Sequence, residues 1–119
     1  MKDLKPANMQ FAVTHKQKYS HNNQEYYDEI EFIDNDTGKM TITYVSESNR
    51  NYSKWEQLIR AMEDKPGHGV LVSGDFRLKK GKTNKNNLPI VNADVTDLAF
   101  EDYVPLEEFM NIVREKYYA

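Results

Sequence analysis

Residues 69–100 read GVLVSGDFRLKKGKTNKNNLPIVNADVTDLAF, and this stretch decides the fold. Apolar and polar residues alternate in its first part, where Val70, Val72 and Phe76 share one face. The alternation resumes in its last third. A period of two residues is typical of a β-strand. The stretch therefore predicts two strands joined by a polar loop over residues 80–87, and it favours a core position for Phe76.

The same two-residue period recurs in three earlier segments, and a turn is predicted at residues 34–38, where Asp, Asn and Gly tolerate positive φ. Over residues 52–64 the period changes. From Trp55 onward the apolar residues fall at i, i+3, i+4 and i+7, which predicts a helix with Trp55 in the core. A second helix is predicted over residues 105–118. The predicted strands cover residues 9–19, 25–34, 39–46, 70–79 and 88–100.

The order of these elements is three strands, one helix, two strands and a final helix. A five-stranded Greek-key barrel is the OB-fold, whose exposed face and loops bind oligonucleotides. We therefore expect a mainly β protein, with an OB-fold domain over residues 1–101 and a helix between its third and fourth strands. Residues 102–119 are expected to form a C-terminal helical extension, packed on the barrel or on a second subunit.

Composition places the chain among small intracellular proteins. Its 119 residues are enough for one domain with a core of its own. It has no cysteine, which excludes disulfides and thiolate metal sites and suits a reducing compartment. No apolar run approaches the ~20 residues of a membrane span, and the first ten residues, MKDLKPANMQ, do not resemble a signal peptide. We expect a soluble protein of the cytoplasm that does not contact a membrane.

Charge is unevenly distributed along the chain, although the net charge is only -3. Residues 76–90 contain five basic residues and no acid, whereas residues 94–108 contain six acids and no base. This polarity suits one cationic face on an otherwise anionic body. Eight tyrosines, more than a core of this size needs, leave rings available at the surface.

The stretch at 67–74, GHGVLVSG, resembles a pattern of the single-stranded DNA-binding proteins of bacteria and phages. In that family G-x-x-V-x-V-x-G follows the helix and opens the fourth strand. The basic segment 77–85 is similar to the flexible loop that comes next, and residues 91–100 to the fifth strand. The resemblance is greatest to small phage-encoded members. It implies unspecific binding of single-stranded DNA in replication or recombination, in the host cytoplasm if the chain is phage-encoded.

Such binding needs cations for the phosphates and aromatic faces for the bases. Tyr26 and Tyr27 are adjacent in a predicted strand, so they point to opposite faces, and we expect one in the core and the other exposed. Tyr44 shares its face with Met40 and Ile42, which favours a core ring with its hydroxyl at the rim. The candidate DNA-binding residues are Lys16, Lys18, Tyr19, Tyr26, Tyr27, Tyr44, Arg77, Lys79, Lys80, Lys82 and Lys85.

No pattern indicates catalysis, a metal or a cofactor. His15, His21 and His68 lack the spacing of metal ligands. The turn at residues 34–38 resembles the opening of a calcium loop, but Val45 stands where the loop would need glutamate. The acids Asp28, Glu29 and Glu31 are typical of the exposed face of a strand, although a two-metal nuclease would also use such carboxylates.

The leading hypothesis is non-catalytic coating of single-stranded DNA. The alternative is an OB-type adaptor that binds proteins of a replication or recombination complex, such as a recombinase, without strong DNA affinity of its own. A small nuclease is a third interpretation. Because one OB barrel covers only ~4–16 nucleotides, we expect a dimer or tetramer of identical chains.

Overall fold

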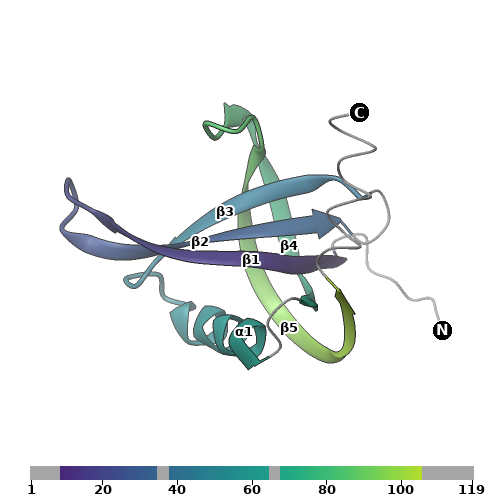
Figure 1. Ribbon diagram of the computed structural model, residues 1–119. Helices are drawn as coiled ribbons and strands as arrows, with labels where there is room; N and C mark the ends of the chain where they lie inside the picture. Colours follow the sequence, from purple (N-terminus) through teal and green to yellow (C-terminus); the bar gives the residue numbers. More distant parts are fainter. Residues whose placement is uncertain (1–8, 35–37, 65–67, 106–119) are drawn as a thin grey trace.

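The computed structural model describes residues 9–34, 38–64 and 68–105. Its five strands form one sheet that closes in a ring in the order β1-β2-β3-β5-β4, with β4 paired back to β1 (Figure 1). All neighbours are antiparallel except β3 and β5, which run parallel. The elements are β1 (Met9–Ser20), β2 (Glu25–Asp34), β3 (Met40–Ser46), α1 (Tyr52–Asp64), β4 (His68–Thr83) and β5 (Pro89–Pro105).

Helix α1 joins β3 to β4 and lies below the ring in Figure 1. Asn51 directly precedes the helix, and its carbonyl oxygen accepts from the N–H groups of Lys54 and Trp55 at 3.0 and 3.4 Å. Trp55 is 1 % exposed, so the predicted core position of this ring is confirmed. Among the described residues α1 is the only helix, and it is too short and too polar to cross a membrane.

Two apolar clusters lie on opposite faces of β2, as its alternation requires. One cluster contains Phe32 and packs against α1, and the predicted core residue Phe76 lies against it, half-buried, with its ring centroid 5.0 Å from that of Phe32. The other cluster contains Ile33 and Ile42, and Leu88 closes it from the loop before β5. The second cluster lies at one end of the face that carries the candidate site.

A β-bulge at Val13 alters the face pattern that the sequence predicts for β1. Ala12 pairs with Phe32 and Thr14 with Glu31, so Val13 is an extra residue between two pairs. Beyond it the side chains exchange faces. Regular alternation along β1 would place His15 on the face of Phe11 and Val13, whereas the bulge turns it to the face of Ile30.

Strands β4 and β5 are longer than predicted. β4 continues to Thr83, so the predicted loop over residues 80–87 shrinks to residues 84–88. This hairpin projects beyond the ring (Figure 1), and Leu78 in it is 63 % exposed. β5 continues to Pro105, across the predicted domain boundary at residue 101. The rest of the predicted helix over residues 105–118 lies outside the described residues.

Candidate nucleic-acid interface

One face of β1, β2 and β3 carries a three-by-three array of side chains. The bulge in β1 brings its lysines to this face, and the pairing of β2 with both neighbours sets three rows across the strands. Because neighbouring strands lie ~4.8 Å apart, the outer columns are separated by about 10 Å. The rows are Thr14, Glu31 and Ile42, then Lys16, Glu29 and Tyr44, and finally Lys18, Tyr27 and Ser46.

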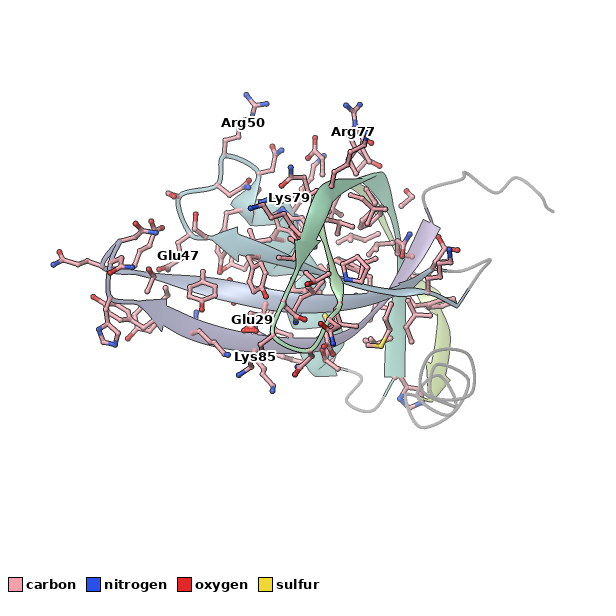
Figure 2. All side chains as sticks on the ribbon, turned by 90° about the horizontal axis from the view of Figure 1, so that it is seen from above. Glu29, Glu47, Arg50, Arg77, Lys79 and Lys85 are labelled. Carbon is pink, nitrogen blue, oxygen red and sulfur yellow. The ribbon has the colours of Figure 1, made fainter. Side chains whose placement is uncertain are left out.

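All members of the array except Ser46 form the floor of a groove of about 640 Å³, and the β4–β5 loop forms its wall. Asn84, Lys85 and Asn86 line the groove from the loop. Figure 2 looks down on the hairpin crossing the strands, with Lys85 beside Glu29 in this view. The side chain of Asn84 shapes the loop, because its Oδ1 accepts from the N–H groups of Asn86 and Leu88, each at 2.9 Å. Burial of Leu88 in the second cluster anchors the loop to the sheet.

Lysines and glutamates share the groove. Lys18 Nζ lies 3.0 Å from Glu29 Oε2, and the hydrogen bond and charge of Glu29 raise the pKa of Lys18. Glu31 Oε1 accepts a 2.6 Å hydrogen bond from Thr14 Oγ1. Three lysines and two glutamates line the groove, so its side chains carry a net charge of +1 at neutral pH.

Two tyrosines supply aromatic surface beside these charges. Tyr27 and Tyr44 meet edge to face, with ring centroids 6.1 Å apart. Partial burial raises the pKa of Tyr44, and the negative charge of Glu29 raises it further, so its hydroxyl stays protonated at neutral pH. Tyr44 is 40 % exposed, so the predicted core position is wrong. At Tyr44 this face of β3 forms part of the groove floor and does not face the core.

The structure separates the other predicted residues from this groove. Tyr19 and Tyr26 lie on the opposite face of the β1–β2 hairpin, stacked edge to face at 5.0 Å, and Tyr26 is 49 % exposed. Neither Tyr26 nor Tyr27 is a core residue, contrary to the prediction, because Tyr27 lies half-buried in the groove floor and Tyr26 is exposed on the other face of the hairpin. Arg77 is exposed, and its Nε lies 2.9 Å from Asp75 Oδ2. The two residues are two apart in a strand and therefore share a face, a signal for this ion pair that the sequence interpretation did not use. Lys79, Lys80 and Lys82 are exposed on β4, outside the groove lining.

The acids of β2 divide between its two faces. Glu29 and Glu31 face the groove, a role that the sequence interpretation missed by treating them as a solvated strand face. Asp28 faces the other way and is 1 % exposed. Its oxygens lie 2.7 Å from His15 Nε2 and 2.8 Å from the Tyr52 hydroxyl, which donates to it. These bonds tie β1, β2 and the start of α1 together behind the groove.

A two-metal nuclease would need to bring carboxylates such as Asp28, Glu29 and Glu31 together around metal ions. Across residues 9–34, 38–64 and 68–105, no three His, Asp or Glu side chains gather in a way that could hold a metal ion. Asp28 also cannot join Glu29 and Glu31 around one ion, because adjacent residues of a strand point apart.

Comparison of the chain with protein-family models, with curated proteins and with solved structures finds no match.

Proposed function

We propose that this chain is an OB-fold protein that binds single-stranded DNA and carries out no catalysis on it. The strand order β1-β2-β3-β5-β4, with a helix between β3 and β4, supports the OB-fold assignment. In that fold the face of the second and third strands and the loop between the fourth and fifth strands bind oligonucleotides. The groove combines that face and that loop, and this placement is the observation that carries the proposal.

The array supplies both contacts that a single strand needs. Lys16 and Lys18 on β1 form a cationic edge for phosphates, and Lys85 faces them from the loop. Tyr44 on β3 offers a ring face for bases on the other side, and Tyr27 offers a second ring from the middle strand. Stacking on such rings tolerates every base, because every base has a π-face. A strand lying along β1 with its bases directed toward β3 satisfies both sets of contacts.

The test is a titration followed by the fluorescence anisotropy of a labelled single strand of mixed sequence, about 20 nucleotides long, which exceeds the ~16 that one OB fold covers. The variant Tyr44→Ala removes a ring from the groove. Tyr26→Ala is its matched control, because Tyr26 is a strand tyrosine of similar exposure, 49 % against 40 %, on the opposite face.

We expect wild type to bind at low salt with at least the micromolar affinity typical of unspecific complexes. Tyr44→Ala should weaken binding roughly 5- to 150-fold, since a stacked base contributes ~1–3 kcal/mol, and Tyr26→Ala should bind within about twofold of wild type. Equal losses in the two variants would place the contact elsewhere on the molecule.

The adaptor interpretation remains the second candidate because of the two carboxylates in the groove. Glu29 and Glu31 repel phosphates but would attract a basic peptide segment of a replication or recombination protein. No anisotropy change with any single-stranded probe, from a sample with an intact near-ultraviolet spectrum, would favour this candidate. In either case a homo-oligomer would extend the binding surface.

A further inference from the structure

The middle column of the array places two carboxylates between the cationic edge and the aromatic side. Glu29 lies between Lys16 on β1 and Tyr44 on β3, and Glu31 follows on the same face of β2. A nucleotide with its phosphate at the lysines and its base at Tyr44 must pass over this column. Acids in that position oppose phosphate binding, so they need a role of another kind.

We propose that Glu29 and Glu31 act as acceptors for base amino groups, so that the groove prefers single strands rich in cytosine over strands rich in thymine. This inference rests on the proposed function and concerns which bases the same groove takes. The feature that carries it is the pair of carboxylates directed into the space between the phosphate contacts and the stacking rings.

The chemistry of the bases sets the direction of the preference. Cytosine presents an N4 amino donor, which glutamate accepts in known complexes. Thymine presents the O4 carbonyl, an acceptor, at the corresponding position. An ionised carboxylate is an acceptor only, so it accepts from the cytosine amino group and repels the O4 carbonyl of thymine. The two pyrimidines share backbone and ring size but also differ at N3 and at C5, where thymine carries a methyl group, so the glutamine variants are needed to assign the preference to the carboxylates.

Both carboxylates retain acceptor capacity after their bonds within the protein. An ionised carboxylate offers about four lone-pair sites, whereas the bonds from Lys18 to Glu29 and from Thr14 to Glu31 use one each. These bonds also hold the carboxylates in place. The Glu29 side chain is 14 % exposed, so a facing carbonyl would have little water to screen it.

The experiment compares oligo-dC with oligo-dT of equal length, about 20 nucleotides, by the same anisotropy titration at a mildly alkaline pH that keeps cytosine neutral. The variants are Glu29→Gln, Glu31→Gln and the two combined. A glutamine side chain both donates and accepts, so it can pair with either base. The control is Glu63→Gln, which makes the same charge change on the exposed face of α1, away from the groove.

We expect wild type to bind oligo-dC at least about fivefold more tightly than oligo-dT, the lower end of what one good base contact discriminates. The ratio should fall to about one in the double variant and stay unchanged in the control. Overall affinity for both probes should rise in the glutamine variants, because a negative charge leaves the groove.

Two results overturn the inference while leaving the proposed function intact. One is wild type that binds both probes equally or prefers oligo-dT. The other is a dC preference that survives in the double variant. The wild-type ratio needs no variant to fold, so the first result is decisive by itself. Failure to bind either probe would overturn the proposed function together with this inference.

Discussion

Replacing Tyr52 with phenylalanine removes one hydroxyl from the network behind the groove and leaves the ring in place. That hydroxyl donates to Asp28 Oδ2 at 2.8 Å, and the carboxylate is 1 % exposed. His15 Nε2 lies 2.7 Å from the other oxygen. The substitution therefore leaves a buried carboxylate with one of its two protein partners missing, at the junction of β2 and α1.

The hydrogen bond sets the size of the effect at neutral pH, and the pKa shift sets how much of it depends on pH. A hydrogen bond to a charged group contributes ~1.5–3 kcal/mol to stability. Burial, and next the bond to Asp28 and its charge, raise the pKa of Tyr52 to about 12 from its ordinary 10.0. Each pKa unit corresponds to ~1.36 kcal/mol, and solvent screening of the partly exposed ring reduces the total to about 1–2 kcal/mol. The first figure is the loss expected at neutral pH, and the second is the part of the difference that should disappear once the hydroxyl ionises.

The assay is urea denaturation of wild type and Tyr52→Phe at several pH values. A pKa raised in the folded state stabilises the fold fully below the unfolded pKa of about 10, and that contribution disappears as pH rises through about 12. The variant should therefore be about 2 kcal/mol less stable at pH 8, and the difference should shrink between pH 10 and pH 12.

The control for general tyrosine ionisation is Tyr26→Phe, on the exposed hairpin, which should match wild type throughout. A difference below ~0.5 kcal/mol at neutral pH would refute the reasoning, since that is the range of ordinary surface substitutions. A difference that stays constant up to pH 12 would refute the role assigned to the ionisation of Tyr52.

Two further predictions concern the β4–β5 hairpin and the groove charge. Gly74→Ala places a Cβ 2.5 Å from the backbone oxygen of Asp94, so it should cost about 1–3 kcal/mol in urea denaturation, and stability equal to wild type would contradict the close approach of β4 and β5. For DNA binding, three groove lysines predict a slope of log K against log salt of about -2, at ~0.7 per phosphate. A slope near -5 would show instead that the cations of β4 also neutralise phosphates.

Sequence patterns predict the elements well where one face of a strand or helix is buried. The spacing of Trp55 and its neighbours defines α1, and alternation defines the start of every strand, because burial imposes those periods. For the projecting part of β4 the sequence pattern predicts a loop, because a strand that leaves the core has no apolar face to mark it. Lys80 and Lys82 illustrate this, because both are exposed.

The candidate site was predictable only in part. Lys16, Lys18, Tyr27, Tyr44 and Lys85 meet in one groove, as a search for cations and rings suggests. The two glutamates among them were missed, because a solvated strand and a groove floor have the same alternation. Distinguishing them requires knowing that a loop distant in sequence crosses above the strand, which is tertiary information that local periodicity does not contain.

The bulge at Val13 has a consequence for how this surface is encoded. If β1 paired without it, each residue from Thr14 to Ser20 would project from the other side, and the groove would receive His15, Gln17 and Tyr19 in place of its lysines. The ionic character of the surface thus depends on how the backbone accommodates one residue as much as on residue identity. Deletion of Val13 would leave Ala12 and Thr14 adjacent with their present partners on β2, so the lysines would stay in the groove, whereas regular pairing that retained Val13 would turn them to the other face.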